Sequence, residues 1–135
     1  MNKILVAYDG SEGSKKALNQ AVELAKCTSS SITILTVVPS ATRMFAFDDL
    51  LVPGTFKSKA LKMVKEVANL IQGISVTSII REGDIADEIL KASEDIGCDL
   101  IVIGSRGLGK VDRFLLGSVA EKVMKHSSKS VLMTR

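Results

Sequence analysis

The sequence contains no tryptophan, one tyrosine, one histidine and only two cysteines. Two cysteines are too few for a disulfide-rich secreted scaffold, and the spacing of Cys27 and Cys98 does not match a zinc motif. We therefore expect both to be reduced thiols in packed positions. His126 lies near the end of a predicted helix, without the serine and acidic partners of a catalytic triad. We predict no catalytic residues and no metal ligands.

Long apolar runs are also missing. No stretch approaches the roughly 18 apolar residues of a membrane span, and the N-terminus enters a short apolar strand without the core of a signal peptide. We therefore expect no membrane span and a cytoplasmic location. The 135 residues, 46% of them hydrophobic, are enough for a single domain over residues 1–135 that buries its core without a metal or a disulfide.

Positive charge is concentrated in the last quarter of the chain. The net charge is only +3, but residues 104–135 hold seven basic and two acidic side chains, a local charge of +5. The five aromatic residues do not alternate with the basic ones, as they would on many nucleic-acid-binding faces. The distribution favours a small polyanion as ligand and argues against a nucleic acid.

Short apolar runs alternate with segments of helical period. The runs that predict strands are Ile4–Ala7, Ile32–Val38, Ile74–Ile80, Leu100–Ile103 and Val131–Met133. The helical segments cover about residues 17–25, 60–71, 85–93, with Asp84 as the predicted N-cap, and 119–124. This order predicts an α/β fold with a mostly parallel sheet and helices on both faces. In such sheets the ligand binds outside the carboxyl ends of the strands, where the winding reverses.

Two of the loops that follow strands have unusual chemistry. Asp9-Gly10-Ser11 follows the first strand, and a glycine-rich stretch from Gly104 to Lys110 follows the fourth. Glycines there allow positive φ and the close approach of a ligand, so that backbone amides can form an anion-binding nest. Gly117-Ser118 begins the last helix, where the dipole favours phosphate. If the first and fourth strands are neighbours, all of these groups face one crevice.

Two common phosphate motifs do not fit this stretch. Gly104-x4-Gly109-Lys110 resembles a P-loop, but Val111 replaces the hydroxyl residue that holds magnesium. The dinucleotide fingerprint fails because Asp112 stands where its third glycine belongs.

The pattern Gly104-x2-Gly107-x9-Gly117-Ser118 resembles the glycine signature of ATP-binding universal stress proteins. The resemblance extends over the whole chain. The blocks that carry it are ILVAYDGSEGSKKAL, SITILTVV, REGDIADEIL, DLIVIGSRGLG and LLGSVAEKVM. Several blocks at the correct spacing are specific, whereas any one of them would be weak.

This resemblance implies a Rossmann-like open five-stranded parallel sheet in the order 3-2-1-4-5, with helices on both faces. It also implies an ATP site, with any Mg²⁺ held mainly by the phosphates. The implied nucleotide-binding residues are Ala7, Tyr8, Asp9, Val37, Ile103, Gly104, Arg106, Gly107, Gly109, Gly117, Ser118 and Val119. For Asp9 alone, the residues leave open whether it contacts the nucleotide or closes an Asx turn.

The implied function is that of an ATP-binding stress-response module with little or no catalysis. One alternative is a slow ATP-hydrolysing or phosphotransferring enzyme that a partner completes. Another is a scaffold or chaperone-like subunit with a vestigial site. The fifth strand lies at a sheet edge in the implied order, and its apolar row Val131-Leu132-Met133 predicts a homodimer. Residues Ser127–Ser130, just before this strand, lack the prolines typical of the family.

The stretch from Pro39 to Phe56 has no clear periodicity and is longer than an ordinary structureless loop. It holds three of the five aromatic residues, and Phe45 and Phe47 are among them. We expect either a short extra helix folded onto the core or a mobile lid or partner-binding element.

Overall fold

The structure is a computed structural model that describes residues 1–40, 53–106 and 116–135. The strands are β1 (Lys3–Ala7), β2 (Ser31–Val38), β3 (Val76–Glu82), β4 (Leu100–Gly104) and β5 (Ser130–Thr134). The helices are α1 (Glu12–Thr28), α3 (Pro53–Asn69), α4 (Ile85–Ile96) and α5 (Ser118–His126). Of the helices in these ranges, none has the length and apolar character needed to cross a membrane.

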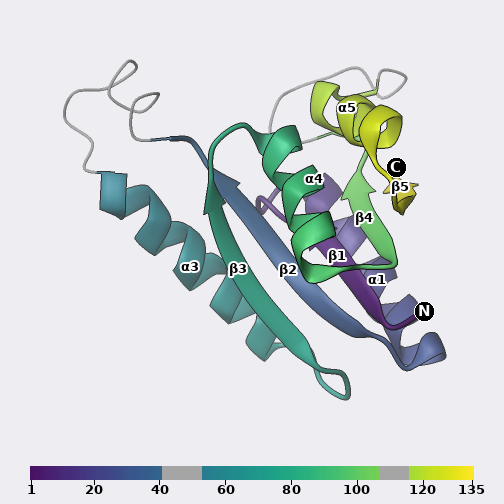
Figure 1. Cartoon of the computed structure of the whole chain (residues 1–135). Coiled ribbons are helices and arrows are strands. Elements are labelled where there is room, and N and C mark those ends of the chain that lie inside the picture. Colours follow the sequence, from purple (N-terminus) through teal and green to yellow (C-terminus); the bar gives the residue numbers. More distant parts are fainter. Residues whose placement is uncertain (41–52, 107–115) are drawn as a thin grey trace.

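The strands form one parallel sheet in the order β3-β2-β1-β4-β5. Helices α1 and α3 cover one face and α4 and α5 the other (Figure 1). The predicted fold class, strand order and two-sided helix cover are therefore confirmed.

The core explains why β1 and β4 read as continuous apolar runs. On β1, Ile4 and Val6 pack toward α1 and α3, whereas Leu5 packs toward α4 and α5. All three side chains are fully buried. A strand covered on both faces has no position for a polar side chain, so alternation disappears from its sequence.

The third strand is displaced from its predicted position. It was expected over Ile74–Ile80 and runs over Val76–Glu82. Ile74 packs against the core from the turn at Gly73, where φ is +84°, so this residue is apolar without being in the strand. At the other end, Arg81 and Glu82 extend the ladder by pairing with Val37 and Val38 of β2.

Side chains cap the first turns of α1 and α4, whereas the N-cap residue of α5 is a glycine. The Ser11 hydroxyl accepts the amide of Ser14 at the start of α1, and the Asp84 carboxylate accepts the amide of Asp87 at the start of α4. Asp84 is thus confirmed as an N-cap. Helix α5 begins at Ser118, and its N-cap residue Gly117 has no side chain to cap the first turn. The amides of that turn therefore depend on some other acceptor.

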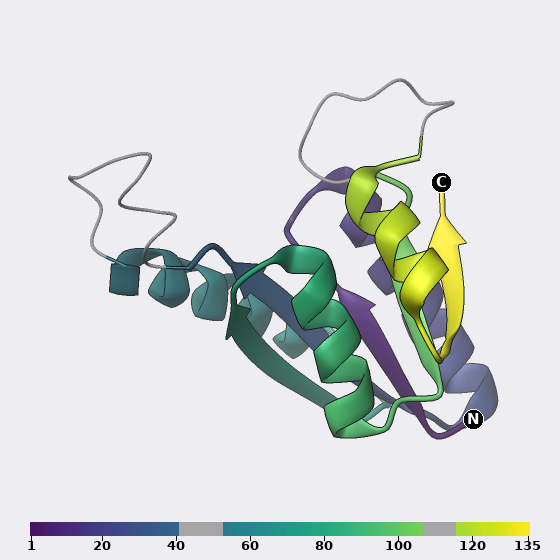
Figure 2. The same cartoon turned by 45° about the horizontal axis from the view of Figure 1, so that its top comes forward.

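The carboxyl ends of β1 and β4 lie side by side. Their register pairs Ile4 with Leu100 and Val6 with Val102. The winding reverses between these two strands, because β2 and β3 lie beyond β1 and β5 lies beyond β4 (Figure 2). The loops after both strands therefore open at the same edge of the sheet, as the hypothesis of a shared crevice requires.

The stretch predicted to be irregular from Pro39 to Phe56 ends earlier than expected. Helix α3 begins at Pro53, a residue that suits the first helical position because its missing amide has no partner there. The predicted lid or extra helix falls on residues 41–52, which lie outside the described residues.

The two cysteines differ in their surroundings. Cys98 is buried in the turn between α4 and β4, and burial is the largest effect raising the pKa of its thiol. Cys27 is exposed near the end of α1, so the expectation that both thiols are packed is wrong for this residue. Cys27 lies on the polar side of α1, away from the buried face that includes Ala17, Ala21 and Ala25.

Asp99 connects the starts of β1 and β4, at the end of the sheet opposite the loops that follow these strands. Its Oδ2 atom accepts the backbone amides of Asn2 at 2.7 Å and Lys3 at 2.9 Å. The Asp99 amide in turn donates to the Lys3 carbonyl at 2.9 Å. The two amides that it accepts, Asn2 first, hold the pKa of the Asp99 carboxyl below its ordinary value.

The two hydrogen bonds to the Asp99 carboxylate predict that the stability of the protein falls in acid. A depressed folded-state pKa stabilises the protein above the unfolded-state pKa, and the benefit is lost as pH falls through the folded value. We expect Asp99→Asn to lower stability at neutral pH and the difference from wild type to close as pH falls through and below the ordinary aspartate pKa of about 4. Urea unfolding at several pH values measures this. Glu23→Gln, an exposed carboxylate on α1, is the control; a gap for Asp99→Asn that stays constant with pH would contradict the prediction.

Candidate functional site

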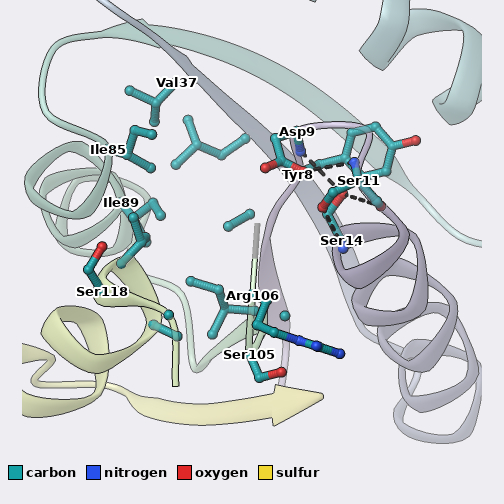
Figure 3. Close-up of a pocket in the computed structure, with 17 residues that line it drawn as sticks. Tyr8, Asp9, Ser11, Ser14, Val37, Ile85, Ile89, Ser105, Arg106 and Ser118 are labelled. Atoms are coloured by element: carbon teal, nitrogen blue, oxygen red, sulfur yellow. Dashed lines mark hydrogen bonds between the residues drawn. The ribbon is translucent and has the colours of Figure 1, made fainter. Parts of the chain in front are cut away.

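A cavity of about 350 Å³ opens where the β1 and β4 loops meet the starts of α4 and α5 (Figure 3). Six elements or their flanking turns contribute to it: β1, α1, β2, β4, α4 and α5. The lining residues are Ala7, Tyr8, Asp9, Ser11, Ser14, Leu35, Val37, Ile85, Ile89, Ile103, Gly104, Ser105, Arg106, Gly117, Ser118, Val119 and Ala120.

The structure brings the predicted site residues together. Ten of the twelve line this cavity, although they come from four separate parts of the sequence. The other two, Gly107 and Gly109, lie outside the described residues. Their common location supports the predicted site, and the binding role of each residue remains a prediction.

A hydrogen-bonded turn positions Asp9 at the cavity. Its Oδ1 atom accepts the Ser11 amide at 2.9 Å, and its own amide donates to Ser14 Oγ at 3.3 Å. Ser14 Oγ donates to the Ser11 carbonyl at 3.0 Å, which closes the network. The Asx turn considered from the sequence is therefore present. It engages one carboxylate oxygen and holds the exposed Asp9 side chain beside the cavity (Figure 3).

An apolar wall lies across the cavity from Asp9. Val37 at the end of β2 and Ile85 and Ile89 on the first two turns of α4 form it (Figure 3). Ile89 is buried in the core, whereas Ile85 is 47% exposed. A large apolar side chain half open to solvent at a cavity mouth offers a contact surface for a flat, weakly polar group.

The start of α5 supplies hydrogen-bond donors. Gly117, Ser118, Val119 and Ala120 all line the cavity, and the N-cap residue Gly117 has no side chain that could cap this helix start. The first-turn amides of a helix lack carbonyl partners within the helix and carry the positive end of its dipole. This end of the cavity therefore favours an anion.

The profile of the universal stress protein family matches residues 1–135. This chain belongs to the universal stress protein family. The universal stress protein YxiE of Bacillus subtilis is 36% identical over an alignment covering 99% of each chain. A putative universal stress protein of Staphylococcus epidermidis is 36% identical over 98% of this chain and 82% of its own length.

Solved structures share the fold of this chain. The structure of the hypothetical protein MJ0577 superposes with a TM-score of 0.85 at 30% identity, over 98% of this chain and 94% of that one. A universal stress protein from Archaeoglobus fulgidus, solved in complex with dAMP, gives a TM-score of 0.76 at 21% identity, over 100% of this chain and 98% of that one. At this lower identity the second likeness shows the shared fold.

Glycines in this universal stress protein serve a purpose that the sequence did not predict. Gly104 and Gly117 do not have positive φ. A Cβ atom on Gly104 would lie 2.8 Å from the Gly13 carbonyl carbon, and one on Gly117 would lie 2.8 Å from the Ser105 carbonyl oxygen. The expectation of positive φ was therefore wrong for Gly104, and neither of the two positions depends on it. They are glycine because the backbones of β4, α1 and α5 touch there.

Gly13 completes this contact, and sequence reasoning missed it. A Cβ atom at Gly13 would lie 2.5 Å from the Arg106 carbonyl oxygen. We call Gly13, Gly104 and Gly117 the glycine contact. Together with the bond from the Gly117 amide to the Ser105 carbonyl (2.7 Å), it fixes the chain at Ser105 between α1 and α5.

Only some of the basic side chains in the last quarter of the chain lie at the cavity, as far as the described residues show. Among the described residues, Lys122, Lys125 and Lys129 form ion pairs with carboxylates on α4 or α5. Arg106 is the basic side chain that lines the cavity. The local charge of +5 therefore overstates the positive charge that the described part of the universal stress protein presents to an anion.

Several lining residues were not predicted as site residues. They are Ser11, Ser14, Leu35, Ile85, Ile89, Ser105 and Ala120. Ile85 and Ile89 were identified as the apolar face of a helix, and the same face extends from the core into the cavity. In the described ranges, no three His, Cys, Asp or Glu residues form a group that could hold a metal ion.

Proposed function

We propose that this universal stress protein binds ATP in the cavity between α4 and α5 and serves as a nucleotide-binding module of a stress response. One observation carries the proposal: the start of α5, whose N-cap glycine has no capping side chain, and the apolar wall of Val37 and Ile85 line the same cavity. An anion-binding end and an apolar end match the two ends of a nucleoside triphosphate.

We assign each part of the nucleotide to a part of the cavity lining. The base lies against Val37, Ile85 and Ile89, and Asp9 accepts a hydrogen bond from a ribose hydroxyl or the base amine. The phosphates extend toward the Ser118 amide and Arg106, where the helix dipole and the guanidinium favour negative charge. Bound Mg²⁺ would offset phosphate charge and be held mainly by the phosphates.

The named relatives support this proposal at two levels. The sequence relatives are universal stress proteins at 36% identity, which supports the stress-response role. The Archaeoglobus fulgidus protein in complex with dAMP shows that a protein of this fold takes an adenine nucleotide.

A proline at Ser118 tests the proposal. Gly117 has ψ of 149°, an extended conformation that a following proline accepts, and proline is tolerated at the first position of a helix. Ser118→Pro therefore removes one donor amide while α5 still forms. We expect a loss of ATP affinity between about tenfold and about a hundredfold in isothermal titration, since a bond to a charged acceptor contributes roughly 1.5–3 kcal/mol.

Ser118→Ala is the matched control, because it removes the hydroxyl and keeps the amide. We expect it to bind ATP more tightly than Ser118→Pro does. A wild-type chain that shows no heat with millimolar ATP would overturn the proposed function. Continued release of phosphate from bound ATP would show that the protein hydrolyses ATP, and the proposed function would then be that of an ATP hydrolase and not of a binding module.

We also propose a homodimer through β5. This strand is at a free edge of the sheet, and Val131, Leu132 and Met133 are half-buried there. Leu132 packs against the core on the α1 side, so a charge at Leu132 would disturb folding as well as pairing. A second copy would pair with the backbone amides and carbonyls of β5 that point away from β4.

A cytoplasmic location is part of the same proposal. Cys27 is exposed and Cys98 is buried, and both are free thiols. An exposed free thiol suits a reducing compartment better than an oxidising one.

A further inference from the structure

Lys122 joins the two helices that line the cavity. Its Nζ atom lies 2.8 Å from Oδ1 of Asp87 and 3.4 Å from Oδ2 of Asp84. Lys122 is on α5 and both carboxylates are at the start of α4, and these helices lie side by side (Figure 2). The bond with Asp87 is the largest effect raising the pKa of the Lys122 ammonium group.

These ion pairs lie close to the cavity on both helices. Lys122 is four residues after Ser118, so the two side chains lie on the same face of α5. Asp84 directly precedes Ile85, which lines the apolar wall. Strand β4 and the residues after it separate α4 from α5 along the chain. No short connection in the sequence therefore fixes the start of α4 relative to the start of α5.

We propose that Lys122 is a positioning residue that holds α4 against α5 and so fixes the distance between the apolar wall and the anion-binding end of the cavity. The inference rests on the proposed nucleotide site. It assigns to Lys122 an effect on ligands that reach both helices, without contact between Lys122 and the ligand.

Lys125 offers a matched control on the same helix. Its Nζ atom lies 2.8 Å from Glu121 Oε1, the same distance as the pair between Lys122 and Asp87. The bond to Glu121 stays within α5 and connects no second element. Lys125→Met therefore removes one surface ion pair within α5, whereas Lys122→Met removes the two pairs that connect α5 with the start of α4.

The test compares three probes by isothermal titration: ATP, adenosine and inorganic tripolyphosphate. ATP contacts both helices, whereas each of the other two contacts one of them. We expect Lys122→Met to weaken ATP binding about threefold to fivefold, the range of an exposed ion pair worth up to about 1 kcal/mol. Adenosine and tripolyphosphate affinities should change less than about twofold, and Lys125→Met should leave all three unchanged.

Two further variants separate positioning from general stability. Lys122→Arg keeps the charge and should restore ATP affinity. Asp87→Asn removes the shorter of the two pairs and should reproduce most of the loss. Adding Lys122→Met to it should cause less further loss than Lys122→Met causes alone, because both variants remove the pair between Lys122 and Asp87. A wild type without ATP affinity overturns the proposed function and this inference with it. A wild type that binds ATP, with Lys122→Met and Lys125→Met equal to each other, overturns the positioning role alone.

Discussion

Gly13→Ala should lower the free energy of unfolding by about 2–3 kcal/mol, although alanine is the better helix former by about 1 kcal/mol. The added methyl group would lie 2.5 Å from the Arg106 carbonyl oxygen. That oxygen belongs to backbone held by neighbouring contacts, so α1 or the chain at Arg106 must move. Because Arg106 lines the cavity, we expect ATP affinity to fall about tenfold as well.

Chemical denaturation and ATP titration of the same preparations check this result. Asn19→Ala, at an exposed position within α1, is the control and should leave stability unchanged or slightly higher. If Gly13→Ala were as stable as that control, the glycine contact would not determine the position of α1.

Met133→Pro should convert the proposed dimer into a monomer at micromolar concentration. The Thr134 carbonyl accepts the Ser105 amide, so Thr134 directs its backbone groups toward β4. Alternation along the strand then directs the Met133 amide away from the sheet. Proline at Met133 removes that donor from both copies and leaves the β4 ladder intact, as proline does on edge strands.

Light scattering measures the mass of each variant. Met133→Ala keeps the amide and should remain dimeric, which separates loss of the donor from loss of the side chain. A Met133→Pro chain that is folded and still dimeric would place the interface elsewhere on the molecule.

The element order and sheet topology could be predicted because burial leaves clear patterns. Leu100–Ile103 is apolar at every position since β4 is covered on both faces, and Asp84 precedes a helical period because its carboxylate caps α4. The location of the site followed from two loops with unusual chemistry after neighbouring strands.

Contacts between distant backbones could not be predicted in the same way. Gly13 reads as an ordinary glycine near a helix start, and only the assembled fold shows the Arg106 carbonyl against it. Lys122 reads as one more basic residue, and its partners on α4 lie more than thirty positions away. Side-chain periodicity carries no information about either contact.

The chemistry at the anion-binding end has a consequence for acidity. Its donors are backbone amides, which do not ionise, and the described lining contains no histidine or cysteine, the side chains that change charge near neutral pH. Between about pH 6 and pH 8, the protonation of the described lining should therefore stay constant. Any drift in nucleotide affinity over that range would come from the terminal phosphate, which takes up its last proton near pH 6.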